Sequence, residues 1–232
     1  MREICFDTET TGLDPAGGHR VVEIGGVELI NRVPTGKTYH IYLNPERDMP
    51  VEAFQVHGLS EAFLADKPLF QDVVEDFLEF VGDAKLVIHN ASFDMKFLNW
   101  ELKACGRPTL PMSQAIDTVA MAREKFPGAA ASLDALCKRF GIDNSARTKH
   151  GALLDAELLA EVYIELTGGR QTGLTFGEDG PAQTTANSTA RVASMTDRPV
   201  REPRPHAPSA EEDAAHKAFL AKISNPIWTA AE

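Results

Sequence analysis

Apolar residues along the first third of the chain stand in short runs that are typical of β-strands. These runs are bounded by Gly- and Pro-bearing turns and predict strands at residues 2–6, 20–29 and 37–43. We expect the three strands to pair as an antiparallel meander. Further along, apolar residues recur at helical spacing and stop at Gly or Pro. This spacing predicts helices at residues 69–81, 93–105, 118–125, 133–140 and 152–166, with short strands at 86–89 and 114–117.

Strands that first form a meander and then alternate with helices indicate an α/β fold, with a mixed sheet and helices packed on its faces. We expect this domain to cover residues 1–167. The composition then changes, because 19 of the 43 residues in 168–210 are Gly, Pro, Thr or Ser and only five are large and apolar. Such a stretch buries too little surface to offset its ordering entropy, so residues 168–210 are expected to form a flexible linker.

The pattern of a helix returns at the end of the chain. Ser209-x-x-Glu212 has the form of a capping box, and Ala215, Phe219 and Ile223 follow at helical spacing. A segment this short does not make a domain of its own. We therefore treat residues 211–232 as a short amphipathic segment at the end of a tail.

Charge and cysteine usage narrow the class of protein. The 232 residues carry 23 Lys and Arg against 34 Asp and Glu, a net charge of −11. Such acidity argues against holding long nucleic acid on a broad basic surface, although a bound metal can supply positive charge in a small site. Three widely spaced cysteines offer no disulfide framework or zinc site. With no signal segment and no apolar run near the ~18 residues that span a membrane, we expect a cytoplasmic protein.

A pair of acids follows the first predicted strand. Asp7 and Glu9 stand two residues apart in the segment Phe6-Asp7-Thr8-Glu9-Thr10-Thr11-Gly12. Side chains two apart in an extended chain point to the same face, and two close carboxylates repel unless they are protonated or bridged by a cation. Such paired oxygen ligands suit Mg²⁺ or Mn²⁺. Taken alone, the tripeptide more often marks an ordinary solvated strand end.

A second segment, His89-Asn90-Ala91-Ser92-Phe93-Asp94, leaves a predicted strand and enters a helix. Ligand sites in open α/β sheets lie at the carboxyl ends of strands, so Asp94 is placed to face Asp7. The alternative is that Asp94 only interacts with the helix dipole and that Asn90 or Ser92 is a helix cap. We interpret His89 as structural.

The third segment opens the last long helix, where Asp155 falls in the first turns and His150 lies on the loop before it. A neutral imidazole near a metal-bound water is a suitable general base. Taken singly, this piece also fits an acid at a helix start and a surface histidine. Four carboxylates and one histidine, all at strand ends or helix starts, together suggest a two-metal centre that clamps the attacking and leaving oxygens of a phosphoryl displacement.

These three segments resemble the motifs of the DEDDh 3′ to 5′ exonucleases, with a histidine rather than a tyrosine before the last acid. Residues 20–26, Arg-Val-Val-Glu-Ile-Gly-Gly, and residues 56–59, Val-His-Gly-Leu, are similar to secondary signatures of the same family. The resemblance covers residues 1–166. It implies a ribonuclease H-like fold, a mixed five-stranded sheet flanked by helices.

The resemblance also implies a reaction and the roles of individual residues. The expected activity is metal-dependent hydrolysis of a 3′ end that releases nucleoside 5′-monophosphates, with His150 deprotonating the attacking water. The residues that would hold two divalent ions, Mg²⁺ or Mn²⁺, are Asp7, Glu9, Asp94 and Asp155. The residues that would contact the terminal nucleotide are Asp7, Glu9, Glu52, His57 and Asp155.

Within the family, the closest resemblance is to the proofreading members that serve bacterial DNA polymerase III. Residues Gln171, Leu174 and Phe176 fit the Q-x-x-L-x-F pattern by which bacterial proteins dock on the beta sliding clamp. Residues Phe219, Ile223 and Trp228 resemble a segment that anchors on the polymerase (alpha) subunit. The alternatives are a coincidental linker sequence at 171–176 and a final helix that folds back on its own domain.

The partners implied are therefore the alpha subunit, the beta clamp and single-stranded 3′ DNA ends, with no membrane. The sequence leaves open a small accessory subunit. Two other functions stay open at this point. An RNA-trimming DEDDh exonuclease would use the same five residues, but it would lack the long tail. A metal-bound, non-catalytic adaptor that tethers clamp and polymerase would keep the tail and lack nuclease activity.

Overall fold

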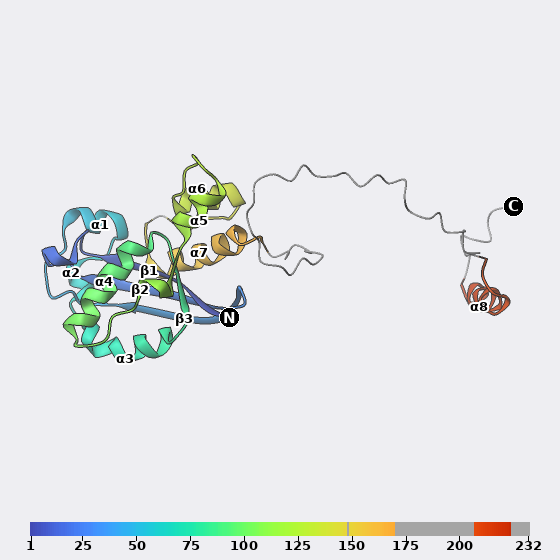
Figure 1. Cartoon of the computed structure of the whole chain (residues 1–232), viewed down its shortest axis with the longest axis horizontal. Helices are drawn as coiled ribbons and strands as arrows, with labels where there is room; N and C mark the ends of the chain where they lie inside the picture. The colour runs from blue at the N-terminus through green and yellow to red at the C-terminus, as the bar shows by residue number, and fades with distance from the viewer. Residues whose placement is uncertain (148, 170–206, 224–232) are drawn as a thin grey trace, which may run out of the picture. The chain divides into compact units, whose positions relative to one another are not determined.

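The computed structural model describes residues 1–147, 149–169 and 207–223 of the chain (Figure 1). The chain divides into two compact units at residue 177, and each unit is considered by itself below. The first unit contains a five-stranded sheet, and the second contains a single described helix. None of the helices in these ranges is long and apolar enough to cross a membrane.

The sheet has the order β3-β2-β1-β4-β5, so the first strand lies at its centre. Strands β1, β2 and β3 form the antiparallel meander that the sequence predicts, and β4 and β5 add to β1 in parallel. The bounds of the strands are β1 Arg2–Thr10, β2 Val21–Ile30, β3 Val33–Tyr42, β4 Lys85–Ile88 and β5 Ala115–Asp117. The mixed sheet expected from the pattern is therefore confirmed.

Helices cover both faces of the sheet. The bounds of the α-helices in this unit are α1 Val51–His57, α2 Glu61–Leu64, α3 Phe70–Val81, α4 Ala91–Ala104, α5 Thr118–Lys125, α6 Leu133–Phe140 and α7 Ala152–Leu166. Two short 3₁₀ turns, η1 at Pro15–Gly17 and η2 at Met112–Gln114, complete it.

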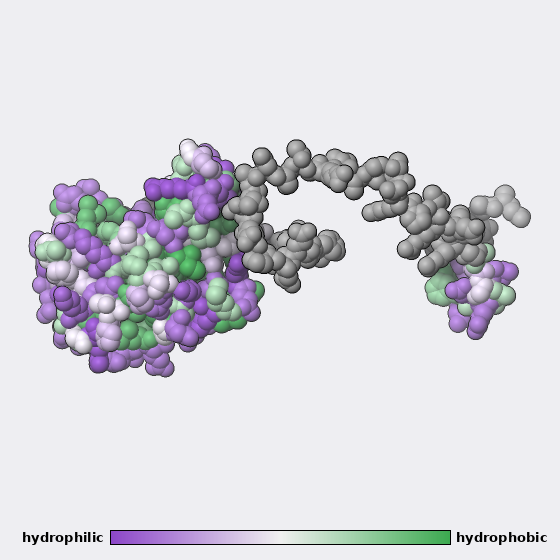
Figure 2. Space-filling model, in the orientation of Figure 1, coloured by the Kyte–Doolittle hydropathy of each residue, from purple (hydrophilic) through white to green (hydrophobic). Residues whose placement is uncertain are grey.

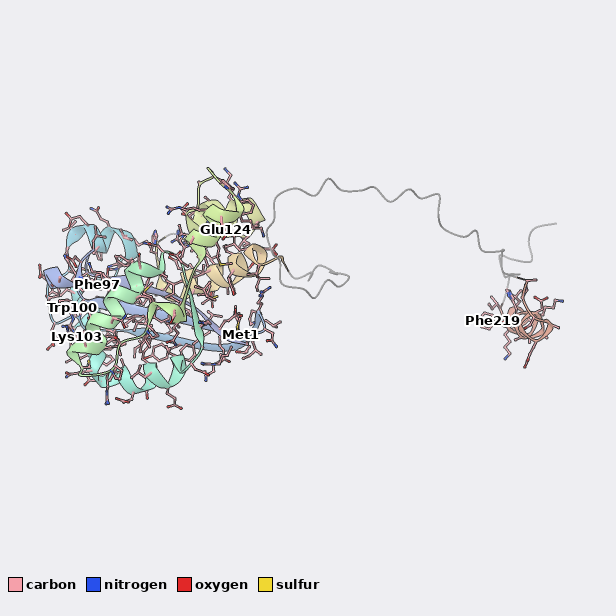
Figure 3. The ribbon with its side chains drawn as sticks, in the orientation of Figure 1. Met1, Phe97, Trp100, Lys103, Glu124 and Phe219 are labelled. Atoms are coloured by element: carbon pink, nitrogen blue, oxygen red, sulfur yellow. The ribbon has the colours of Figure 1, made fainter. Side chains whose placement is uncertain are left out.

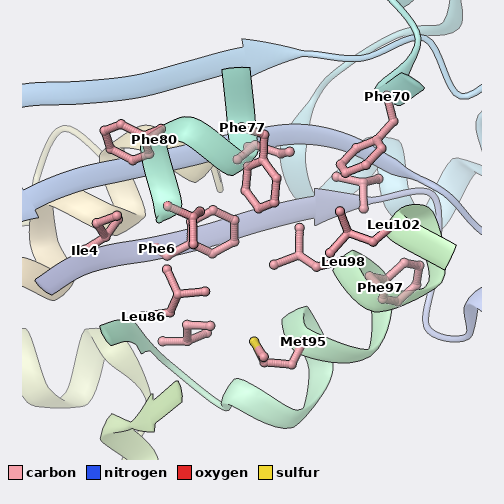
Figure 4. Close-up of a cluster of buried hydrophobic side chains, with 14 of the residues drawn as sticks. Ile4, Phe6, Phe70, Phe77, Phe80, Leu86, Met95, Phe97, Leu98 and Leu102 are labelled. Carbon is pink, nitrogen blue, oxygen red and sulfur yellow. The ribbon is translucent and has the colours of Figure 1, made fainter. Parts of the chain in front are cut away.

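Helices α3 and α4 pack on one face of the sheet. Figure 4 shows this core, in which Phe6 of β1 lies beside Phe77 of α3 in the same cluster as Leu98 of α4. The buried residues of helix α3 recur every three or four positions, so they form one apolar stripe that packs on the sheet. This layer fixes the start of α4 against the carboxyl end of β1.

Helices α5, α6 and α7 bury the opposite face, around Cys5, Val27 and Leu159. Helix α7 is also fastened to β1 by a buried hydrogen bond, in which the Tyr163 hydroxyl donates to Glu3 at 2.7 Å. Its predicted bounds, residues 152–166, agree with the structure. The two layers together place the starts of α4 and α7 at the same end of the sheet.

Several features differ from the pattern-based prediction. Strand β1 continues through Thr10 instead of ending at residue 6, because it stays paired with β2 to that point. Helix α4 begins at Ala91, two residues before the predicted start. The sequence analysis also missed α1 and α2, whose residues are mostly exposed and therefore carry no apolar period.

The second unit contains α8, Ala210–Leu220. The predicted capping box is present, since Ser209 Oγ accepts from the Glu212 amide at 3.2 Å and Glu212 accepts from the Ser209 amide at 2.8 Å. No residue of this helix is buried among the residues described, and Phe219 is 62% exposed. The clamp-like peptide, Gln171 to Phe176, most of the predicted linker and Trp228 lie outside the described residues.

Candidate active site

Asp7 and Glu9 lie within β1, near its carboxyl end. In the ladder with β2, Asp7 stands opposite Gly25 and Glu9 stands opposite Glu23. Directly opposed residues of an antiparallel pair share one face of the sheet, and residues two apart on a strand share it too. Both carboxylates therefore point to the face that α7 covers.

Gly25 explains how close α7 comes to these acids. A Cβ atom at Gly25 would stand 2.2 Å from the backbone carbon of Ala152, the first residue of α7. No side chain fits in that space, so the helix start rests directly on β2. Asp155 is in the first turn of α7 and buried, and it thereby reaches the acids of β1.

Asp94 enters the site from α4. It is buried in the first turn of the helix, and its Oδ1 accepts hydrogen bonds from the Thr8 amide at 3.1 Å and the Thr8 hydroxyl at 2.6 Å. These bonds tie α4 to β1, which a contact with the helix dipole alone would not do. Asn90 stands at the N-cap position without a side-chain capping bond, while His89 bonds with Thr118 at 2.9 Å.

Burial raises the pKa of three of these acids, Asp7, Glu9 and Asp94. Burial, followed by the charges of Asp94, Glu9 and Asp155, places the pKa of Asp7 well above its usual range. Burial and the charge of Asp155 raise the pKa of Glu9 to about 8. Burial raises that of Asp94 to about 7, against the lowering effect of the Thr8 hydrogen bonds. The cluster therefore requires either protons or cations to balance its charge.

Arg147 supplies one such cation. Its Nε and one terminal nitrogen donate to the two oxygens of Asp155 at 2.5 and 2.7 Å, and its other terminal nitrogen donates to Asp134 at 2.9 Å. The Arg147 side chain is only 8% exposed. This guanidinium fastens the loop before α7 to both α6 and α7.

His150 lies on the same loop and borders the acids. Its Nδ1 accepts from Arg147 at 2.9 Å and stands 3.3 Å from Asp155 Oδ2. Because a guanidinium only donates, Nδ1 carries no proton in this arrangement. Its backbone amide also bonds to Val56 of α1 at 3.2 Å. The unprotonated nitrogen of the imidazole therefore faces the acid cluster, with its lone pair engaged by Arg147.

The donor set of this cluster fits hard divalent cations. One ligand atom from each of Glu9, His150 and Asp155 lies within 4.8 Å of the others, and Asp7 and Asp94 interact with the same group electrostatically. Carboxylate oxygens are the ligands that Mg²⁺ and Mn²⁺ prefer. The five residues that the sequence analysis selected are thus brought together at one end of the sheet.

A groove of about 560 Å³ opens beside Glu9. Its walls come from the carboxyl end of β1, the following loop, α1 and the start of α4, and they include Glu52, His57, Leu13 and Phe93. His57 is buried, and its Nδ1 accepts from the Leu59 amide at 3.0 Å, so its proton is carried by Nε2. Nε2 is itself buried, and the Thr10 backbone lies close enough to act on the pKa of His57 through a hydrogen bond.

Comparisons with known proteins identify the family of this chain. A family model described as "Exonuclease" matches residues 4–163. The DNA polymerase III subunit epsilon of Rickettsia felis is 54% identical over 226 residues, which cover 96% of this chain and 97% of that protein. The chain belongs to the exonuclease family, in the branch of the DNA polymerase III epsilon subunits.

Other relatives agree with this placement. The epsilon subunit of Escherichia coli K12 is 49% identical over 189 residues, covering 78% of this chain and 77% of that protein. Among solved structures, exonuclease X in complex with 5′ overhanging duplex DNA has a TM-score of 0.54 at 29% identity, covering 72% of this chain and 90% of that chain. The nuclease domain of 3′hExo, a DEDDh family member bound to rAMP, has a TM-score of 0.62 at 18% identity, which supports the fold alone.

The expectation of a 3′ to 5′ exonuclease with a ribonuclease H-like sheet is confirmed. The sequence analysis missed the contributions of Arg147 and Thr8 to this exonuclease site. Arg147 precedes His150 by three residues, and Thr8 lies between the first two acids. Neither spacing predicts a contact by itself. Only the fold shows that Arg147 reaches Asp155 and that Thr8 reaches Asp94.

Proposed function

We propose that this exonuclease removes mispaired 3′ nucleotides from DNA made by the replicative polymerase, and that Asp7, Glu9, Asp94 and Asp155 hold two divalent ions, Mg²⁺ or Mn²⁺. The observation that carries the proposal is the convergence of four carboxylates whose charge the protein alone does not balance. Two such ions stabilise the charge that develops on the attacking and leaving oxygens.

The residues around the acids have separate tasks in this reaction. His150 accepts the proton of the attacking water at Nδ1, the nitrogen that Arg147 occupies in the structure. Water must therefore replace Arg147 as the hydrogen-bond donor to this nitrogen. Half of the His150 side chain is exposed, which gives water access to the ring.

The groove receives the terminal nucleotide. His57, which carries its proton on Nε2, donates to an oxygen of the sugar or base, and Glu52 offers carboxylate oxygens to a hydroxyl group. The apolar walls formed by Leu13 and Phe93 suit the face of a base. The acids of β1 lie next to this groove, so a nucleotide bound there brings its phosphate to the metal site.

The remaining parts of the chain serve attachment. We propose that residues 1–167 form the catalytic domain, that 168–210 is a linker carrying the clamp-binding peptide, and that 211–232 docks on the polymerase. The partners are then the alpha subunit, the beta clamp and single-stranded 3′ ends. An accessory subunit on the catalytic domain fits the same assembly, which acts in the cytoplasm. The exposed face of α8 supports the docking role, since Phe219 is 62% exposed among the residues that the structure describes.

Nuclease assays with an asparagine variant test the catalytic proposal. We expect Asp94→Asn to lower hydrolysis of single-stranded DNA by at least about 100-fold, since even partners of metal ligands cost 10- to 100-fold when they are changed. Calorimetric titration should show weaker Mn²⁺ binding. Asp83→Asn, which changes an exposed acid outside the cluster, is the matched control. Near-normal turnover of Asp94→Asn with Mg²⁺ would remove this residue from the site.

A further inference from the structure

One face of helix α4 begins at the groove and continues along the helix away from it. Phe93, Lys96, Trp100 and Lys103 follow one another at intervals of three and four residues, and such residues share one face of an α-helix. We call these four residues the α4 stripe. It begins at Phe93, a wall of the nucleotide groove, and extends for about 15 Å at 1.5 Å per residue.

The charge of the stripe differs from that of the domain around it. Residues 1–166 carry 26 acids and 16 bases, yet the exposed charged residues of α4, Lys96 and Lys103, are both positive. The two acids of this helix, Asp94 and Glu101, are buried. Glu101 is held by a two-point pair with Arg20, at 2.7 and 2.8 Å. No acid of α4 therefore competes with a negatively charged ligand along the stripe.

Trp100 is the aromatic centre of this surface. Its side chain is 45% exposed, although Phe97 and Leu98 beside it are buried in the core. Figure 3 shows Trp100 and Lys103 along α4, on the face of the molecule where Figure 2 shows apolar residues scattered among polar ones. An exposed indole between two lysines offers a stacking surface with cations on either side.

Lys96 connects the stripe to the groove. Its ammonium group donates to Asp14 at 2.7 Å, and Asp14 lines the groove together with Phe93. This pair is exposed on both sides, so solvent screens it and a phosphate can replace the carboxylate at little cost. The cationic and aromatic surface is thus continuous with the place where the 3′ nucleotide binds.

We propose that the α4 stripe binds the single-stranded DNA that precedes the 3′ terminal nucleotides, with a base stacked on Trp100 and phosphates near Lys96 and Lys103. The inference rests on the proposed function, because it assigns the direction in which the substrate leaves the groove. Base stacking tolerates any sequence, as a proofreading substrate requires. The few cations keep the contact weak and its salt dependence small.

Two substrates of different length separate the stripe from the active site. The p-nitrophenyl ester of thymidine 5′-monophosphate reaches only the groove, whereas a single-stranded oligothymidylate also covers the stripe. In the full chain with Mn²⁺, we expect Trp100→Ala to lower kcat/KM for the oligothymidylate by about 5- to 150-fold, the range for losing one base–aromatic stack. Hydrolysis of the ester should stay unchanged, and Trp100→Tyr should retain most of the oligothymidylate activity.

Charge reversal on the same helix gives an independent measurement. Lys103→Glu should lower kcat/KM for the oligothymidylate and reduce its dependence on salt, by about 0.7 in the log–log slope for each lost phosphate contact. Lys138→Glu makes the same change at an exposed position of α6, which packs on the opposite face of the sheet, and should leave both substrates unaffected.

The outcomes are decisive in both directions. Loss confined to the oligothymidylate supports the α4 stripe. Variants at Trp100 and Lys103 that hydrolyse both substrates as the wild type does, or that lose both substrates equally, overturn it. A wild-type enzyme that fails to hydrolyse the ester with Mn²⁺ would instead count against the proposed catalytic function.

Discussion

Arg147 balances part of the negative charge that the site concentrates. Its two-point pair with Asp155 satisfies both oxygens of a buried carboxylate, which would otherwise be strongly destabilising. No such partner is present among the described residues for Asp7 or Glu9, and burial raises the pKa of both. At the scale of single residues, Arg147 thus neutralises one acid of the proposed metal site and leaves the charges of Asp7 and Glu9 unbalanced.

These raised pKa values predict how the stability of the metal-free protein depends on pH. The folded-state pKa of Glu9 is about 8 and that of Asp94 about 7, whereas unfolded carboxyl groups titrate near about 4. Between these values the folded state holds protons that the unfolded state has released. The free energy of unfolding should therefore be highest below the unfolded pKa and should fall as pH rises through the folded pKa.

Thermal unfolding in a chelator from pH 6.5 to 8.5 measures this slope. The window lies above the range of His57 and His89, whose pKa values are lowered by burial. We expect Tm to fall across it, less steeply in Glu9→Gln, and not to fall when Mn²⁺ is saturating. A Tm in chelator that rises with pH, or the same slope in Glu9→Gln, would contradict the assignment.

The five expected site residues could be chosen from the sequence because each belongs to a short motif at a strand end or helix start. Their partners could not be chosen in the same way. Arg147 contributes through hydrogen bonds to Asp134, His150 and Asp155, which become neighbours only after α6 and α7 have packed. The position of the His57 proton on Nε2 likewise depends on the local bond to Leu59.

At the scale of elements, the pattern of apolar residues located those helices and strands that bury a regular face. Helix α7 was predicted with its observed bounds, since its buried residues repeat along most of its length. Helix α1 was missed because it exposes most of its residues while forming a wall of the groove. Strand β1 includes Asp7 and Glu9 because its pairing with β2 continues through Thr10. A segment that lines the groove keeps part of its surface open to a ligand. Its apolar residues therefore do not recur at the regular spacing of an element that buries one whole face.

The contact between β2 and α7 yields a prediction about metal binding. Gly25→Ala should place a methyl group against the backbone at Ala152 and push the start of α7 away from the sheet. Overpacking of this kind costs about 1–3 kcal/mol of stability. Because Asp155 moves with the helix, affinity for Mn²⁺ should fall as well, as measured by calorimetric titration.

Gly26→Ala is the matched control for this variant. Its methyl group would meet the side chain of Phe80 at 2.9 Å, on the opposite face of the sheet. A flexible side chain can shift where a helix backbone cannot, and no acid of the site lies there. We therefore expect Gly26→Ala to lower Tm and leave Mn²⁺ affinity intact. Equal Mn²⁺ affinity in the two variants would show that α7 can retreat without moving Asp155.

At the scale of the whole molecule, the candidate active site and the proposed attachment segments belong to different parts of the chain. All acids of the site and the groove lie in residues 7–155 of the first unit. Helix α8 belongs to the second unit and exposes Phe219. An acidic domain with few cations binds DNA weakly by itself, so its activity at a primer end should depend on tethering, which raises its effective concentration.

The tail variants test this division of labour. If 171–176 binds the clamp and 211–232 binds the polymerase, Leu174→Ala with Phe176→Ala should weaken binding to purified clamp alone, and truncation after Ala210 should abolish binding to purified alpha subunit alone. Val192→Ala with Met195→Ala removes apolar residues elsewhere in the predicted linker and is the control. Hydrolysis of a short oligonucleotide should be unchanged in all of these variants. A flexible tether sets how far the catalytic domain can reach and does not alter the structure of that domain. Unchanged clamp binding in the first variant would make the peptide a coincidence. A truncation that lowers hydrolysis and Tm together would mean that the final helix packs on its own domain.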